Sequence, residues 1–557
     1  MPFPITLQEA ERRSASMIAE RESWIPEWED IRNYMLPYHG RFSDDRPNDG
    51  QRKDQRIIQD VAKASLRVLS AGLLSGLTSP SRPWFKLNIP NPLLSESKPA
   101  RSWLDEVERR MYSVFAASNL YSELQKMYVE LGGFGTACAI VSKDYEDVIR
   151  LRTFTIGEYA LALNDSLKVD TMYRDFQMTA RQIEQRFGRD NCSDAVKSSI
   201  ENGRSETWFT VRHLICPNPD IKPGRRDVSG KKFISVYWER GARTDVNDGF
   251  LEVLGYDNFP VLAPRWEVVS NDIYGRGPGW DCRGDVKMVQ DMRADSMEAL
   301  DKMIDPPILL PASMRNEDID LTPGGVTFVP SNEGMTGAHP AFNVAVDMTK
   351  LEYSIESAVS RIRTAFYVDT FLMLQQVADK TKTAYEVAEL TREKMLMLGP
   401  AIEQQEETLL KPIIERTFEI MNDAGLIPDP PEEMQGQSID IEYVSILAQA
   451  QKAVATSGMR EWISIVTELS AAFPEMRLKV NPTEFVDEYG KLLGISAKLI
   501  NSDEEVAEAQ AKERQMMQTQ QAMAMAQQGA QTAKTMSQAR IDDKTNVLAE
   551  LFGEAGV

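Results

Sequence analysis

The stretch 278–304, "PGWDCRGDVKMVQDMRADSMEALDKMI", decides how the rest of the chain is interpreted. Its small and apolar residues recur three and four positions apart, which predicts one amphipathic helix. These residues are Val289, Met292, Ser296, Ala299 and Met303. At about 1.5 Å per residue the helix would be on the order of 40 Å long, a rod and not an ordinary packing element. Helical spacing resumes over 347–365, so two helices bracket the Gly/Pro-rich segment 305–346 and its short strand candidates.

Upstream of this helix, short runs of β-branched and aromatic residues predict a sheet-bearing region. The runs are "TACAIVS" at 136–142, "VIRLRTF" at 148–154, "VDTMYRDFQM" at 169–178, "TWFTVRHLI" at 207–215 and "KFISVYWER" at 232–240. One helix near "TARQIEQRFG" interrupts them, and another is predicted over 56–77, where Gly72 and Gly76 imply close helix packing. The predicted fold class is therefore α+β and mainly helical.

Downstream, residues 381–421 predict a long amphipathic helix with Gly399 and Pro400 in its middle. A proline inside a helix removes a hydrogen bond and costs roughly 3 kcal/mol. Apolar residues line both halves, which favours a kink within one helix, and two helices meeting at a turn is the alternative left open. After residue 500 the chain becomes rich in Gln, Ala and Met, which is typical of a helix or a tail.

Composition narrows the function classes. The chain has 557 residues, which predicts three or four domains, and a formal charge of −21, which disfavours tight binding to nucleic acid. We expect no membrane-spanning helix and no signal peptide, and hence synthesis in a cytoplasm. The scattered cysteines Cys138, Cys192, Cys216 and Cys282 are expected to be reduced thiols.

No motif predicts a catalytic, cofactor or metal site. His39, His213 and His339 are isolated from one another and from the cysteines. "GRGPG" at 275–279 lacks the residues of a phosphate loop and is expected to be a turn. "LGGFG" at 131–135 follows a helix and precedes a strand, so we expect a helix C-cap there. No enzyme activity is predicted.

Charged residues on the predicted helices are the candidate functional residues. Asp291, Asp295 and Glu298 share one helix face, as a solvated acidic stripe or, alternatively, as ligands of a nuclease-like Mg²⁺ site. The basic residues flank the apolar segment after residue 365 or lie on the second helix, and their alternative role is ordinary surface charge. They are Lys350, Arg361, Arg363, Lys380 and Lys382.

Several stretches together resemble the portal, or head-to-tail connector, proteins of short-tailed bacteriophages. In the second half these are "YGRGPGWDCRGDVKMVQDM" at 274–292, "DKMIDPPILLP" at 301–311, "TAYEVAELTREKMLMLGP" at 383–400 and "GLIPDPP" at 425–431. In the first half they are "AGLLSGLTSPSRPWFKL", "GFGTACAIV" and "YRDFQMTARQIEQRFG". The resemblance covers roughly residues 5–500 and leaves the C-terminal tail outside the pattern.

The resemblance implies a dodecameric ring whose subunits have a wing, a two-helix stem, a clip, a tunnel loop, a kinked helix and a helical crown. It implies these boundaries: wing 1–277, first stem helix 278–304, clip 305–346, second stem helix 347–365, tunnel loop 366–382, kinked helix with return to the wing 383–445, crown 446–500 and tail 501–557. In a conduit, the acidic stripe would repel DNA, while Arg361, Arg363, Lys380 or Lys382 would touch phosphates transiently.

The resemblance also implies partners and a location. Besides other copies of itself, the expected partners are double-stranded DNA in the channel, the large terminase, tail adaptor and nozzle proteins, the major capsid protein, and internal core or scaffold proteins at the crown. The expected location is the portal vertex of the virion, after assembly in the host bacterial cytoplasm. The alternatives are another virion structural protein, such as a scaffold or internal core protein, and a DNA-processing enzyme that uses the acidic stripe.

Overall fold

The computed structural model describes most of the chain up to residue 444 and short stretches beyond it. The described residues are 3–42, 50–90, 97–225, 227–241, 247–304, 308–309, 339–340, 347–376, 398–434, 439–444 and, from 462 onward, stretches of which 462–470 is the longest. Contacts divide the chain into two units, Met1–Gln451 and Lys452–Val557. In the second unit, 462–470 is helical, and β13 (Arg540–Asp542) pairs with β14 (Thr545–Asn546). All further description concerns the first unit.

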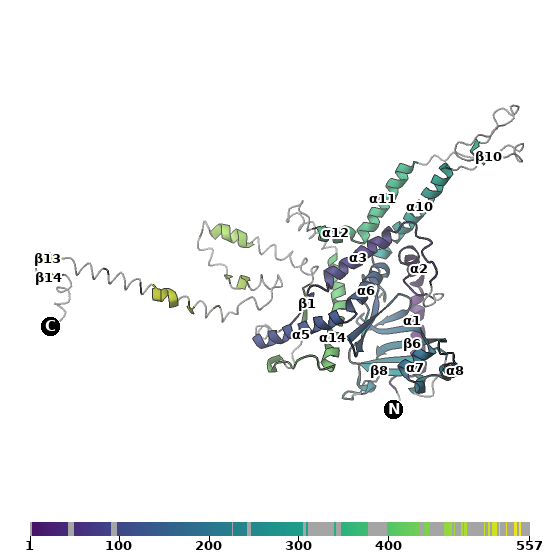
Figure 1. The fold of residues 1–557 in the computed structure, drawn as a ribbon, viewed down its shortest axis with the longest axis horizontal. Helices are drawn as coiled ribbons and strands as arrows, with labels where there is room; N and C mark the ends of the chain where they lie inside the picture. Colours follow the sequence, from purple (N-terminus) through teal and green to yellow (C-terminus); the bar gives the residue numbers. More distant parts are fainter. Residues whose placement is uncertain are drawn as a thin grey trace. The chain divides into compact units, whose positions relative to one another are not determined.

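The N-terminal part of this unit is helical (Figure 1). Its helices are α1 (Leu7–Glu22), α2 (Ile25–Tyr34), α3 (Val61–Leu77), α5 (Lys98–Ala117) and α6 (Leu120–Phe134). α3 packs against α6 at small residues, because a Cβ atom on Gly132 would lie only 2.7 Å from Leu66 Cδ1. Gly72 faces Phe371 in the same way, so the close helix packing predicted for α3 is confirmed at this glycine.

The predicted start of α3 at residue 56 is wrong, because the helix begins at Val61. The amides of Ile58 and Gln59 donate to Gln290 Oε1, at 2.7 and 2.9 Å, and so are held by a distant side chain outside any helix. A tertiary contact therefore overrides the local apolar spacing at this end.

Two antiparallel sheets follow. The larger has the order β4-β5-β6-β7-β8 and the smaller β3-β2-β9. Their strands are β2 (Cys138–Asp144), β3 (Val148–Phe154), β4 (Tyr159–Leu163), β5 (Val169–Thr179), β6 (Trp208–Pro217), β7 (Phe233–Glu239), β8 (Glu252–Tyr256) and β9 (Val261–Leu262). All five predicted runs are strands, and the α+β class is confirmed. Short 3₁₀ turns lie at Arg189–Asn191, Val228–Gly230, Asn247–Gly249 and Glu432–Met434.

Helices cover both faces of the five-stranded sheet. One apolar cluster joins α1, through Leu7, Ala10 and Met17, to inward residues such as Trp238. On the other face, α7 (Ala180–Phe187) and α8 (Asp194–Glu201) lie in sequence between β5 and β6, where only one helix was predicted. α7 begins at a capping box in which Thr179 and Gln182 satisfy each other's amides.

Beyond the sheets the chain forms a long helical pair. α9 (Pro278–Asp281) and α10 (Arg283–Ile304) are separated by Cys282, and α11 (Met348–Ala365) runs beside α10 (Figure 1). Of the segment between them, β10 (Ile308–Leu309) and β11 (His339–Pro340) are described and pair antiparallel. The described part of 366–382, where a loop was expected, contains the helix α12 (Val368–Gln376).

The last helical part begins, in the described residues, at 398. It runs as α-helix to 405, as a π-helix over Glu406–Leu410 and as α14 over Lys411–Asp423. The Lys411 amide donates to the Glu406 carbonyl five residues back, directly before Pro412, which has no amide hydrogen to donate. The chain then returns as β12 (Asp440–Tyr443), which pairs antiparallel with β1 (Phe85–Asn88).

Candidate functional site

The helical pair is seated on the body by two glycine-rich stretches. "LGGFG" ends α6, with Gly135 in the left-handed conformation at φ 81° and its amide bonded to Leu131 O, so the predicted C-cap is confirmed. "GRGPG" leads into α9 and packs backbone to backbone against it, because a Cβ atom on Gly279 would lie 2.3 Å from Gly133 O. Trp280 Nε1 donates to Phe134 O at 2.8 Å. These glycines are needed for close approach of two chain segments.

Charged and polar side chains of α10 bind its first turns to the helical N-terminal part. Lys287 pairs with Asp30 of α2 at 2.5 Å, and Arg283 pairs with Glu27 of the same helix. Gln290, which is 3% exposed, accepts from the amides of residues 58 and 59 and donates to the Gln59 carbonyl at 2.7 Å. Sequence reasoning missed this anchor. Its signal was a polar residue on a helix face that carries Val286 and Val289.

Two ion pairs join α10 to α11 across an apolar seam. The seam consists of Val286, Val289, Ile355, Ala358 and Ile362, all fully buried. Arg293 forms a bidentate pair with Glu352 at 2.7 and 2.8 Å, and Arg361 pairs with Asp285 at 2.6 Å. The Arg293 hydrogen bond holds the pKa of Glu352 below its ordinary value, and the Asp285 hydrogen bond raises the pKa of Arg361.

The predicted acidic stripe is present on α10. Asp291, Asp295 and Glu298 are exposed and, at 100° per residue, lie on the side of the helix away from Val286 and Val289. A hydrogen bond from Lys302, one turn further, lowers the pKa of Glu298. Among the described residues, no group of three or more His, Cys, Asp or Glu side chains is arranged to hold a metal ion.

The predicted basic residues are not brought into one cluster. Lys350 is exposed at the start of α11 and pairs with Asp347, while Arg361 is engaged with Asp285. Arg363 is exposed in the last turn of α11. Lys380 and Lys382 lie outside the described residues.

The far half of the pair exposes apolar side chains. On α10 the exposed fractions are 57% for Met297, 46% for Leu300, 46% for Met303 and 74% for Ile304, and Tyr353 on α11 is 75% exposed. Met297, Leu300 and Ile304 continue the helix face that carries the buried Val286 and Val289 near the start of α10, which we call the root of the pair. These three side chains form an apolar stripe that has the character of a contact surface. The stripe has no partner among the described residues.

Gly399 and Pro400 lie in the first described turn of the helix that starts at 398. Leu398 and Ile402 beside them are buried, and Pro400 is exposed. The residues before them lie outside the described part, so the kink stays a prediction. The irregularity that the structure does contain is the π-helix ahead of Pro412.

The remaining reactive side chains are placed as packing residues. All four cysteines are free and buried, and burial raises the pKa of Cys192 and of Cys216 to about 11. His39 Nδ1 lies 2.7 Å from Glu130 Oε1, and His213 is fully buried with its pKa well below the ordinary value. Within the described residues, no helix is long and apolar enough to cross a membrane.

Comparison with known proteins shows which family this chain is similar to. Residues 7–500 match the family described as bacteriophage head to tail connecting protein. The probable portal protein of Bordetella phage BPP-1 is 40% identical over 521 residues, which covers 94% of this chain and 93% of that protein. The portal protein of Salmonella phage epsilon15 is 38% identical over 539 residues, covering 97% and 96%.

Proposed function

This chain belongs to the family of bacteriophage head-to-tail connecting proteins, and from that premise we propose that its copies close into a ring through α10 and α11. The chain is a phage portal protein that connects head and tail in the virion. The ring forms the conduit at one capsid vertex through which double-stranded DNA is packaged and ejected, and we assign it no catalytic activity.

One observation carries this proposal: the apolar stripe on the far half of α10. Its exposed side chains, Met297, Leu300 and Ile304, continue a face that is buried near the root. Contiguous exposed apolar surface marks sites of association, and contact between unlike patches generates a ring where the rotation closes. A second copy presents the same elements and is the occupant that we propose. Twelve copies are expected from the family.

The charges of the pair suit a conduit. With Arg361 and Lys350 engaged by carboxylates of the same chain, few cations of α10 and α11 are left to neutralise phosphates. Each neutralised phosphate strengthens binding to DNA, so a channel wall that lacks free cations lets DNA slide. We propose that Asp291, Asp295 and Glu298 face the bore, and that Arg363, Lys380 and Lys382 meet the DNA at one level.

We further propose the family architecture for this chain. α10 and α11 would form the stem, 305–346 the clip, 366–382 the tunnel loop, the helix around Gly399 and Pro400 the kinked helix, and 446–500 the crown. The large terminase and then tail adaptor and nozzle proteins would dock on the clip, the major capsid protein would surround the ring, and core or scaffold proteins would meet the crown. Assembly would occur in the host bacterial cytoplasm.

Native mass spectrometry and negative-stain averages of the purified protein test the ring. We expect closed particles of about twelve copies with a central hole. Leu300→Asp should abolish them, whereas Leu167→Asp, at a position in the body that is also exposed (43%), should leave them intact. Extended particles without a hole, or rings that form equally with Leu300→Asp, would contradict the proposal.

A further inference from the structure

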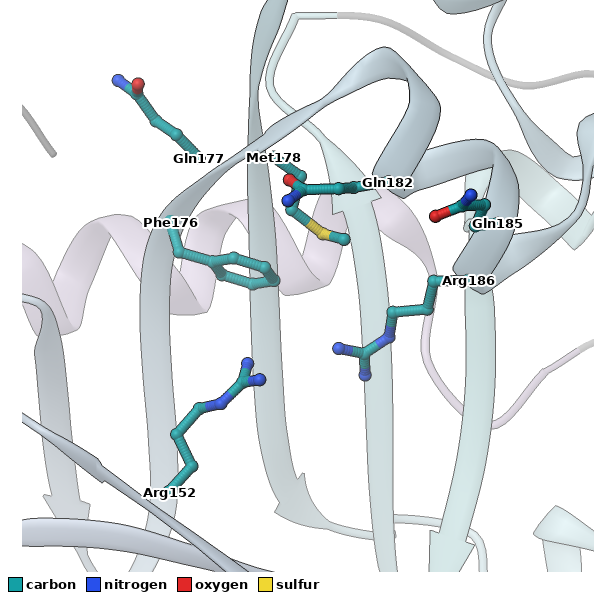
Figure 2. A pocket seen from close by; sticks show the side chains of 7 residues that line it. All are labelled: Arg152, Phe176, Gln177, Met178, Gln182, Gln185 and Arg186. Atoms are coloured by element: carbon teal, nitrogen blue, oxygen red, sulfur yellow. The ribbon is translucent and has the colours of Figure 1, made fainter. Parts of the chain in front are cut away.

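A cavity of about 450 Å³ lies at one face of the five-stranded sheet, beneath α7 (Figure 2). β3 contributes Arg152, β5 contributes Phe176 and Met178, and α7 contributes Gln182, Gln185 and Arg186. Arg152 and Arg186 extend toward the same space from opposite sides, and the Phe176 ring lies above the Arg152 guanidinium in this view (Figure 2). Two guanidinium groups thus converge on a cavity with an apolar wall.

A third arginine lies behind this wall. Arg174 is 5% exposed, and its guanidinium stacks over Phe176 at 4.1 Å and over Phe154 at 4.4 Å. Its Nε donates to His213 Nδ1 at 3.2 Å, and burial keeps that histidine neutral. Burial also lowers the pKa of Arg174 to about 10.

These arginines differ from others on and beside the same helix. Arg181 pairs with Glu206 at 3.1 Å, and Arg189 pairs with Glu201 at 2.8 Å. Within the described part of the chain, Arg152, Arg174 and Arg186 have no carboxylate at ion-pairing distance. Arg186 stacks on the Phe187 and Tyr237 rings at 5.0 and 4.7 Å. Burial raises the pKa of Glu252, which interacts electrostatically with Arg186 from β8.

We propose that this cavity binds an aspartate or glutamate side chain on an acidic segment of a second protein molecule. A carboxylate accepts two parallel hydrogen bonds from a guanidinium, and Arg152 and Arg186 offer two such groups. The amides of Gln182 and Gln185 supply further donors, while Phe176 and Met178 fit the methylene groups of the incoming side chain.

Two further observations favour a carboxylate over a phosphate. The first-turn amides of α7, which would otherwise cradle a phosphate, are partly occupied by the capping box of Thr179 and Gln182. Acidic segments are also plentiful, because each copy of the chain carries 84 Asp and Glu against 63 Lys and Arg. The assignment of this cavity does not depend on ring closure.

Fluorescence polarisation of a labelled tetraglutamate peptide with the purified full-length protein tests the proposal, with tetraglutamine as the neutral probe. We expect binding of tetraglutamate alone, weakened about tenfold or more by Arg152→Gln and by Arg186→Gln. Arg181→Gln, on the same helix but outside the cavity, should leave the affinity unchanged. Arg152→Lys keeps the positive charge but lacks the two parallel donors of the guanidinium, and it should give an intermediate affinity. Circular dichroism melting confirms that each variant is folded.

Equal affinity in all variants, or no binding of tetraglutamate, would overturn the proposal. So would a 20-base-pair DNA duplex or inorganic phosphate that displaces the peptide at lower concentration than free tetraglutamate does. Sedimentation of the wild type and of Arg152→Gln identifies the source of the segment. Loss of self-association in the variant assigns it to a second copy, and unchanged self-association with lost peptide binding assigns it to a different protein. Both of these outcomes support the carboxylate site.

Discussion

The body of the first unit and the α10–α11 pair use apolar residues in different ways. In the body, large side chains such as Trp84, Phe115 and Trp238 are fully buried by other parts of the same chain. In the pair, burial is complete only near the root, at Val289 and Ile362 for example, and the far half leaves its apolar stripe exposed. The body is therefore stabilised within one copy, whereas we propose that the far half of the pair is covered by other copies.

The largest expected effect compares two leucines. Leu69 of α3 is fully buried, and Leu300 of α10 is 46% exposed. Leu69→Ala should lower the free energy of unfolding of the monomer by about 2–5 kcal/mol, since it leaves a cavity in the core. Leu300→Ala should change it by less than about 0.5 kcal/mol and instead weaken ring assembly. Urea titration followed by circular dichroism measures the free energy of unfolding of both variants. Equal losses of this free energy in the two variants would contradict the comparison.

A smaller effect is expected where the pair is seated on the body. Gly279→Ala would place a Cβ atom 2.3 Å from Gly133 O, so α9 must shift, at a cost of about 1–3 kcal/mol of unfolding free energy. Gly284→Ala is the matched control. Its Cβ atom would meet nothing within 4 Å, and it should stabilise α10 by up to about 1 kcal/mol. Thermal unfolding of the two variants tests this. Equal melting temperatures would contradict close packing of α9 against α6.

The pH dependence of the free energy of unfolding should also distinguish the body from the helical pair. Burial raises the pKa of Glu108 in the body to about 7, although its carboxylate accepts from the Leu87 amide at 2.6 Å. Because the folded pKa exceeds the unfolded value, the favourable contribution is complete below about pH 4.5 and is lost as the pH rises through 7. The free energy of unfolding should fall between pH 5 and pH 8. Glu108→Gln should flatten this part of the profile, and an unchanged slope would refute the assignment.

The smallest effect belongs to the exposed ion pair of the helices. The folded pKa of Glu352 lies below its ordinary value, so its contribution with Arg293 is present above the unfolded pKa and is lost as the pH falls through the folded pKa. A double-mutant cycle with Arg293→Ala and Glu352→Ala should give a small coupling at pH 7 that weakens as the pH is lowered and that also weakens in 0.5 M salt. A coupling as large as the Leu69 effect would mean that charge, and not neighbouring copies, stabilises the pair.

The strands were predictable where residue type and burial agreed. β3 and β7 are rich in branched and aromatic residues, so their sequences alone predicted them. β4, "YALAL", was missed because alanine has little strand preference, and it is held by its pairing with β5. The π-helix was not predicted, because Pro400 and Pro412 both lack an amide hydrogen and the sequence does not show that the irregularity lies ahead of Pro412.

The candidate site was predictable only residue by residue. The helix faces of Asp291 and Glu298 follow from spacing along one element. The partners of Arg361 and Arg293 could not be predicted, because Asp285 and Glu352 lie on the other helix and many residues away. The cavity between Arg152 and Arg186 was missed for the same reason. It joins β3 of the smaller sheet to α7, which packs on the five-stranded sheet.

Methionine oxidation footprinting tests most directly whether neighbouring copies cover the far half of the pair. The assembled wild type is compared with monomeric Leu300→Asp, and oxidation of Met297 and Met303 is read by mass spectrometry, with the fully buried Met127 as the protected reference. The account predicts strong oxidation of both residues in the monomer and protection in the ring. Equal oxidation in the two states, with Met127 protected in both, would contradict it.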